Sequence, residues 1–264
     1  MLAEQHAEYA MSIQLQKADL DYFKRGEWEN PRFWNRLGGQ PDLHGKKVLD
    51  LGCGHGSLCV DMAKAGAARV IGVDINARLI EFAQRNLELN YPELVGRVEF
   101  YCIDIAELDE GDFDLMTSKD TFEHVMDLEG VLHEMYKRLK PGGLLYAAIG
   151  PLWNSPFGDH DHLKRVFGVN LPWAHLIVPQ RVAMRWLSRK LGRELHSYRD
   201  LGMNMLAFAD YRRIIEQSGF EILFFKPNNS RHPVLRAFAL IARIPFLTEY
   251  FTNNLYCILR RPQA

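Results

Sequence analysis

The residue types best suited to acid–base chemistry gather in two short stretches, residues 118–124 and residues 159–162. The second of these alternates aspartate with histidine. In an extended segment alternate residues lie on the same side, so His160 and His162 would face one way. Histidine titrates near neutrality, and a neighbouring carboxylate could orient it as a base or complete a metal site. The alternative is a solvated, histidine-rich turn.

The stretch from residue 118 to residue 124 carries two carboxylates one helical turn apart, at Asp120 and Glu123, followed by His124. Both carboxylates could therefore face one ion. Mixed carboxylate and imidazole ligands suit several divalent metals without choosing among them. We expect Asp120, Glu123 and His124, with His162, to be candidate metal ligands. Without a metal, Asp120, His160 and His162 are the candidate catalytic residues.

A glycine-rich turn links an apolar run to a helical pattern between Val48 and Leu58, with glycines at Gly52, Gly54 and Gly56. Glycine permits positive φ and a close approach of a ligand to the backbone. The dinucleotide fingerprint needs a glycine where Ser57 stands, and no Gly-Lys-Ser/Thr follows, so neither a dinucleotide site nor a P-loop is indicated. A tight turn that binds nothing is the simpler alternative.

An acidic residue, Asp74, ends the next apolar run, at a place where a carboxylate can accept hydrogen bonds from ribose hydroxyls. Together with the glycine turn, it predicts a nucleoside ligand that lacks a pyrophosphate.

These stretches, together with residues 139–143 (Leu-Lys-Pro-Gly-Gly), resemble the class I S-adenosylmethionine-dependent methyltransferases over about residues 45–150. The resemblance implies that Asp50 lies near the methionine amino end and that Asp74 binds the ribose. It also implies that Asp104 binds the adenine amino group and that Ile105 packs on the ring. The full set of implied cofactor residues is Asp50, Gly52, Cys53, Gly54, Asp74, Ile75, Asp104, Ile105 and Ser118.

The acid-x-x-Glu-His arrangement at residues 120–124 is similar to one found in ubiquinone-type O-methyltransferases and small-RNA 2′-O-methyltransferases, where it holds a divalent metal. The resemblance thus adds a possible divalent metal ion to S-adenosyl-L-methionine as a cofactor.

Strand-like and helix-like patterns alternate from Lys46 to Gly150, which predicts an α/β fold with right-handed crossovers. The resemblance implies a Rossmann-like, seven-stranded, mostly parallel sheet between helices, with an antiparallel last strand. Strands are expected at 47–51, 69–73, 97–102, 113–117, 143–149, 220–226 and 254–260. Helices are expected at 57–65, 76–89, 127–138 and 208–218.

We expect residues 1–264 to form a single domain in which residues 45–150 bind the cofactor. Residues 1–40 would be an amino-terminal helical cap, with an aromatic segment broken by Pro31. Residues 151–205 and 229–252 would be cap insertions that form an aromatic substrate pocket. A basic helical segment follows Gln180, and a solvated helix face is the expectation there.

The composition is that of an ordinary globular protein, with 47% hydrophobic and 25% charged residues. Since the formal net charge is only −1, DNA is not an expected partner. The cysteines at Cys53, Cys59, Cys102 and Cys257 form no Cys-x-x-Cys pair, and reduced thiols in the cytoplasm are the simplest account. We expect no signal peptide and no transmembrane segment.

The function expected from these observations is methyl transfer from S-adenosylmethionine to a small-molecule acceptor, most simply to a hydroxyl oxygen. Methylation of RNA ribose is an alternative. The Asn/Asp-Pro-Pro-aromatic sequence of amino-directed nucleic-acid methyltransferases does not follow the fourth strand. A non-catalytic subunit that binds the cofactor is the alternative from another class.

Overall fold

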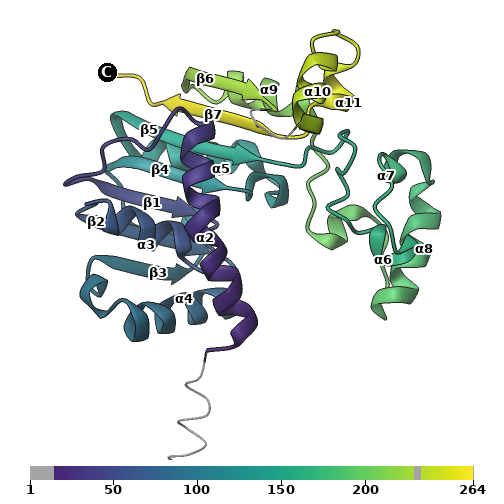
Figure 1. Ribbon diagram of the computed structural model, residues 1–264. Helices are drawn as coiled ribbons and strands as arrows, with labels where there is room; N and C mark the ends of the chain where they lie inside the picture. Colours follow the sequence, from purple (N-terminus) through teal and green to yellow (C-terminus); the bar gives the residue numbers. More distant parts are fainter. Residues whose placement is uncertain (1–14, 229–232, 264) are drawn as a thin grey trace, which may run out of the picture. The chain divides into compact units, whose positions relative to one another are not determined.

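The computed structural model describes residues 15–228 and 233–263, and within them seven strands form one sheet in the order β3-β2-β1-β4-β5-β7-β6 (Figure 1). β1 is parallel to β2 and β4, β2 is parallel to β3, and β7 is antiparallel to both β5 and β6. This is the predicted Rossmann-like α/β architecture. The strands are β1 (Lys47–Leu51), β2 (Arg69–Asp74), β3 (Val98–Cys102), β4 (Phe113–Lys119), β5 (Leu139–Ile149), β6 (Glu221–Pro227) and β7 (Leu255–Arg260).

The chain divides into two compact units, residues 1–117 and residues 118–264, with the division inside β4. Each unit is described separately. That the whole chain is one methyltransferase domain stays a prediction.

The first unit is built on β1 and β2, which are buried along almost their whole length, as strands covered on both faces are. Val48, Leu49, Val70 and Ile71 are all completely buried. The helical elements of this unit are α2 (Lys17–Arg36), α3 (Ser57–Lys64), α4 (Ala77–Asn90), η1 (Pro92–Leu94) and η2 (Ile105–Glu107).

Helix α2 is continuous through Pro31, so the expected break in the aromatic segment is wrong. Burial explains why the helix continues past Pro31, because Phe33 and Trp34 are each only 3% exposed. The Trp34 indole donates to Asp61 Oδ2 on α3 at 3.2 Å. This packing outweighs the helix-breaking preference of one proline. Residues 1–14 of the expected amino-terminal cap lie outside the described residues.

The second unit contains an insertion with an apolar cluster of its own. Leu163, Ala183, Leu187 and Tyr198 are buried together in it. The helical elements of this unit are η3 (Phe122–His124), α5 (Leu128–Arg138), α6 (Lys164–Phe167), α7 (Ala174–Ile177), α8 (Gln180–Leu191), η4 (Tyr198–Leu201), α9 (Phe208–Gln217), α10 (Pro233–Ile241) and α11 (Thr248–Phe251). Within the described ranges, no helix combines the length and hydropathy needed to cross a membrane.

Strand β5 begins at Leu139, four residues before the predicted start. The Pro-Gly-Gly sequence after Lys140 therefore belongs to the strand. Its backbone is held from the far end of the chain: Gly142 N donates to Arg261 O at 2.8 Å, and Arg261 N donates to Gly143 O at 2.9 Å. Residues 229–232, which begin the second expected cap insertion, lie outside the described residues; α10 and α11 occupy most of the rest.

Candidate functional site

The glycine turn after β1 is a left-handed turn at three positions, with φ of 72° at Gly52, 52° at Gly54 and 80° at Gly56. The two later glycines meet different surroundings. A Cβ on Gly56 would come within 2.5 Å of the Phe100 ring, so the fold itself requires glycine there. A Cβ on Gly54 would meet no described heavy atom within 4 Å. Gly54 therefore borders open space, as a backbone that cradles a ligand would.

Asp74, at the end of β2, is bonded to this turn. Its Oδ2 accepts from Gly54 N at 2.9 Å, and its Oδ1 accepts from Asn76 N at 2.8 Å. Each carboxylate oxygen has two lone pairs, so both can accept a further hydrogen bond from a ligand hydroxyl. Next to it Ile75 is 79% exposed. An exposed apolar side chain beside a carboxylate suits a nucleoside.

Asp50 is deep in the unit, only 3% exposed. Its Oδ1 accepts from Thr117 Oγ1 at 2.7 Å, and the Cys59 thiol lies 3.6 Å from its Oδ2. Burial, followed by the contact with the Cys53 thiol and the charge of Asp50, raises the pKa of Cys59 well above its usual value. Burial is also the main cause of the raised pKa of Cys53. Both thiols therefore stay protonated.

The two predicted residues after β3 differ in exposure. Asp104 is exposed, and its Oδ1 accepts from Ala106 N at 2.9 Å, which caps η2. Ile105 is only 1% exposed. Asp104 is thus accessible to a ligand, whereas Ile105 belongs to the packed core and leaves little surface for an aromatic ring.

A further polar cluster, missed by sequence reasoning, connects α2 with the glycine turn. Asp19 accepts from Arg78 Nη1 at 2.9 and 2.8 Å, and the His55 Nε2 atom lies 2.9 Å from its Oδ1. The Tyr22 ring lies 4.5 Å from the His55 ring. The hydrogen bonds of His55, then those of Arg78, lower the pKa of Asp19. Only the residue types could have signalled it, since the three are far apart in sequence.

In the second unit, Ser118 and Glu123 are both buried, and both keep a polar atom without a hydrogen-bond partner among the described residues: Ser118 Oγ and Glu123 Oε2. Glu123 Oε1 accepts from Gly150 N at 3.3 Å. Burial, with a smaller contribution from the charge of Asp120, raises the pKa of Glu123 well above its usual value. Glu123 is therefore an inward-facing acid whose neutral form is favoured by burial.

Two histidines of this unit pack together, with the His124 and His160 rings 5.1 Å apart. His124 Nδ1 lies 2.8 Å from Gly202 O, and His160 Nε2 lies 3.2 Å from Pro151 O. Because a carbonyl only accepts, each of these nitrogens carries a proton, and in the neutral ring the other nitrogen has the lone pair. Burial, with the nearby His124, lowers the pKa of His160 to about 4. His160 is therefore neutral at pH 7.

The segment that contains His160 and His162 is a series of turns, so the expected extended conformation is wrong. His160 and Asp161 both have positive φ, of 51° and 62°. The Asp159 side chain is bonded to the backbone, because its Oδ2 accepts a hydrogen bond from Leu163 N at 2.8 Å. Burial lowers the pKa of His162, and its Nδ1 is buried without a partner among the described residues.

Among the residues that the structure describes, no three His, Cys, Asp or Glu side chains come together so as to hold a metal ion. The set expected from the sequence, Asp120, Glu123, His124 and His162, is not assembled. The Glu123 carboxyl group accepts a hydrogen bond from the buried Gly150 amide, and His124 Nδ1 is bonded to the Gly202 carbonyl oxygen. Asp120 lies at the end of β4 with φ of 54°, and its amide donates to Ala148 O at 2.9 Å.

Comparisons with known proteins agree with this description of the fold. Residues 42–151 match a family model described as a methyltransferase domain. The ubiquinone biosynthesis O-methyltransferase of Neisseria meningitidis serogroup A is 36% identical over 137 residues, which are 49% of this chain and 56% of the relative. The chain thus spans about half the length of this curated relative.

Among solved structures, a putative S-adenosylmethionine-dependent methyltransferase from Listeria monocytogenes superimposes with a TM-score of 0.58 at 20% sequence identity. The superposition covers 90% of this chain and 98% of the Listeria chain. The Haemonchus contortus phosphoethanolamine N-methyltransferase 2 in complex with S-adenosyl-L-methionine has a TM-score of 0.57 at 15% identity, over 89% of this chain and 53% of its own. Residues 42–151 therefore match the methyltransferase domain family, and the chain has the class I, Rossmann-like fold that S-adenosylmethionine-dependent methyltransferases also have.

Proposed function

We propose that the protein transfers the methyl group of S-adenosylmethionine to an oxygen atom of a small-molecule acceptor. The observation that carries the proposal is the turn after β1, in which Gly54 borders open space and its amide is bonded to Asp74. The relative from Neisseria meningitidis, named an O-methyltransferase, favours oxygen as the acceptor atom.

The residues of the first unit fit the cofactor. The backbone of the glycine turn would lie against the methionine part, Asp74 would accept the ribose hydroxyls, and the exposed Asp104 would accept from the adenine amino group. Asp50 would act near the methionine ammonium group through its buried carboxylate. The bound cofactor would supply a methyl group already activated on a sulfonium centre.

For the proton of the acceptor hydroxyl we propose His124 as the base. The Gly202 carbonyl fixes its Nδ1–H, which leaves the Nε2 lone pair for a proton, and the side chain belongs to an exposed residue. His160, His162 and Asp120 remain candidates from the sequence. His160 is a weak base, because burial lowers its pKa to about 4. Such a base contributes roughly 10²–10⁴-fold to a rate.

The test has two parts. Calorimetric titration of the purified protein with S-adenosylmethionine measures binding, and release of S-adenosylhomocysteine with phenols, catechols, alcohols, thiols and amines measures turnover. Binding with turnover on hydroxyl compounds is the expected result. Methylation of amines alone would contradict the choice of oxygen, and binding with no turnover on any acceptor would favour a non-catalytic subunit.

The role of His124 is tested by His124→Ala, with His133→Ala on α5 as the matched control because His133 is another exposed histidine of the same unit. We expect kcat to fall about 10²-fold or more in the first variant, with unchanged cofactor affinity. The control variant should keep the kcat and the cofactor affinity of the wild type. An equal kcat in the two variants would remove His124 from the reaction.

A further inference from the structure

The arginines of helix α8 differ from two exposed arginines on other helices. Each of those two pairs with a glutamate one turn away: Arg85 with Glu81 at 3.0 Å on α4, and Arg212 with Glu216 at 2.9 Å on α9. The sequence of α8, QRVAMRWLSRKL, has no acidic residue. Its three exposed arginines at spacing four, Arg181, Arg185 and Arg189, make no ion pair with any described residue.

Helix stability does not account for this repeat. Like charges one turn apart destabilise a helix by roughly 0.2–0.5 kcal/mol per pair. The opposite face of α8 is what holds the helix in place, because Ala183, Met184 and Leu187 are buried in the apolar cluster of the insertion. Polar residues without charge would serve equally well on the exposed face.

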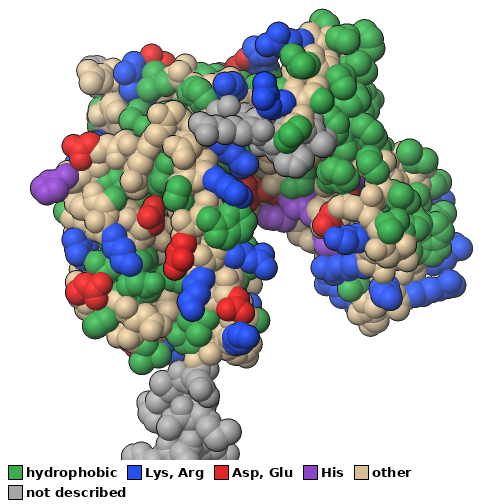
Figure 2. Space-filling view, in the orientation of Figure 1, with side chains coloured by type: hydrophobic (Ala, Val, Ile, Leu, Met, Phe, Trp, Pro, Cys, Tyr) green, Lys and Arg blue, Asp and Glu red, His purple; other side chains and the backbone are tan. Residues whose placement is uncertain are grey.

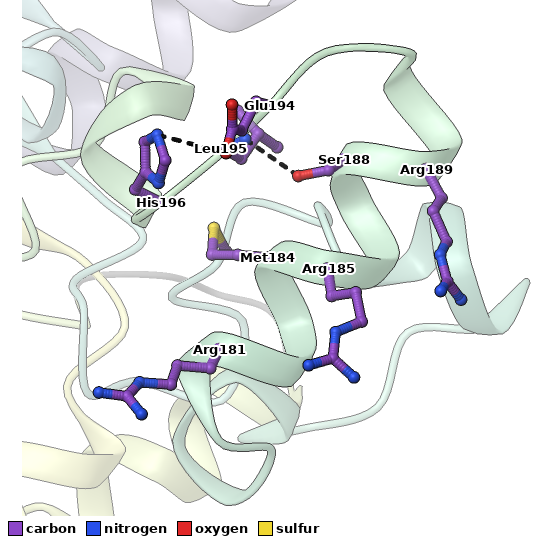
Figure 3. A pocket seen from close by; sticks show the side chains of 8 residues that line it. All are labelled: Arg181, Met184, Arg185, Ser188, Arg189, Glu194, Leu195 and His196. Atoms are coloured by element: carbon purple, nitrogen blue, oxygen red, sulfur yellow. Dashed lines mark hydrogen bonds and ion pairs between the residues drawn. The ribbon is translucent and has the colours of Figure 1, made fainter.

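The arginines line an open groove with a volume of about 500 Å³, which continues to the segment after α8 (Figure 3). In Figure 3 the three arginine side chains leave α8 one turn apart, and His196 and Glu194 stand on the neighbouring segment. Figure 2 shows blue side chains gathered over this part of the chain.

The remaining polar groups of the groove are compatible with an anion. Ser188 Oγ accepts from Leu195 N at 2.9 Å, which leaves the hydroxyl hydrogen available to a ligand. The one acidic residue in the lining, Glu194, lies 4.0 Å from His196 Nε2, and its side chain is 83% exposed at the rim. Its single charge is outweighed by three guanidinium groups.

We propose that this groove binds a phosphate group, either of a soluble phosphoester or of a phospholipid headgroup. Guanidinium groups are planar, always charged, and match phosphate oxygens with two parallel hydrogen bonds. Three unpaired guanidinium groups are more than enough for the charge of a phosphomonoester, about −1.5 to −2 at pH 7, whereas one would be enough for a carboxylate. None of its lining residues belongs to the residues proposed for methyl transfer, and all of them lie between residues 181 and 196.

The experiment follows binding by the fluorescence of Trp186, which lies on α8 itself. Inorganic phosphate and glycerol 3-phosphate are titrated at constant ionic strength, with acetate as the control anion. Vesicles of phosphatidylcholine, with and without phosphatidylglycerol, are tested by co-sedimentation. The variant is R181Q/R185Q/R189Q, and the control is K24Q/R212Q/K226Q, which removes the same charge from exposed positions elsewhere.

We expect phosphate to bind, acetate to bind at least tenfold more weakly, and the α8 variant to lose at least tenfold in phosphate affinity while the control keeps it. Binding to phosphatidylglycerol vesicles together with weak binding of soluble phosphates would identify a lipid headgroup as the source. The α8 variant should unfold at the same temperature or higher, because repulsion between like charges is removed. An absence of binding to both phosphates and vesicles, or equal losses in the two variants, would overturn the proposal.

Discussion

Two glycines of one turn, Gly54 and Gly56, are expected to lose stability and cofactor affinity in opposite orders when each is replaced by alanine. Both have positive φ, 52° at Gly54 and 80° at Gly56, so alanine costs roughly 1–2 kcal/mol of backbone strain at either position. Only at Gly56 does the new Cβ also meet the Phe100 ring, at 2.5 Å. Overpacking of this kind adds about 1–3 kcal/mol.

Gly54→Ala should therefore lower the free energy of unfolding by about 1–2 kcal/mol, and Gly56→Ala by about 2–5 kcal/mol. For a chain of this size each kcal/mol is about 2–4 °C in Tm. The expected decreases are then roughly 2–8 °C for Gly54→Ala and 4–20 °C for Gly56→Ala.

Cofactor affinity should change in the opposite order. The methyl group of Gly54→Ala would occupy the space in which the backbone meets the ligand, so we expect at least a tenfold loss of affinity, about 1.4 kcal/mol. Gly56→Ala, assayed below its Tm, should keep more of the affinity. Calorimetry and thermal unfolding measure the two quantities on the same samples. Equal affinity of Gly54→Ala and the wild type would refute the assignment of the open space at Gly54 to the cofactor.

Three further predictions concern charge and metal. Asp19→Asn should destabilise the protein at pH 7, because the folded-state pKa of Asp19 is lowered and its carboxylate stabilises the folded protein. The difference in stability between wild type and variant should be present above pH 4 and should disappear as the pH falls through the folded-state pKa of Asp19. Thermal unfolding at several pH values measures it. Glu123→Gln should show the reverse dependence of stability on pH, because the folded-state pKa of Glu123 is raised. Wild type and variant should unfold at similar temperatures near pH 4, and the variant should become the more stable of the two as the pH rises. Chelation with EDTA should leave both turnover and cofactor affinity unchanged, because the described residues assemble no metal site; loss of turnover, restored by a divalent ion, would return Asp120, Glu123 and His124 to the role of ligands.

The parts of the fold that the sequence predicts correctly are those fixed by neighbours in the chain. β1 was placed at its observed bounds because a continuous apolar run ends at a glycine turn, and α3 follows at Ser57 for the same reason. β5 was placed too late because Pro141, Gly142 and Gly143 are of residue types that are depleted in strands. Their strand conformation depends on Arg261, more than a hundred residues away, which no local pattern reveals.

The site follows the same division between local and distant causes. Asp74 could be placed from the sequence, because a residue that ends a parallel strand lies at a defined edge of the sheet. The burial and the pKa of a side chain could not be predicted from the sequence, because they depend on what the rest of the chain packs around it. Glu123 is an ordinary acid in the sequence, yet the segment around Gly150 buries it and raises its pKa. The segment with His160 and His162 was expected to be extended, but His160 and Asp161 both have positive φ, which an extended strand does not have. Which residues lie at the site is thus set by topology, and what each can do there is set by burial.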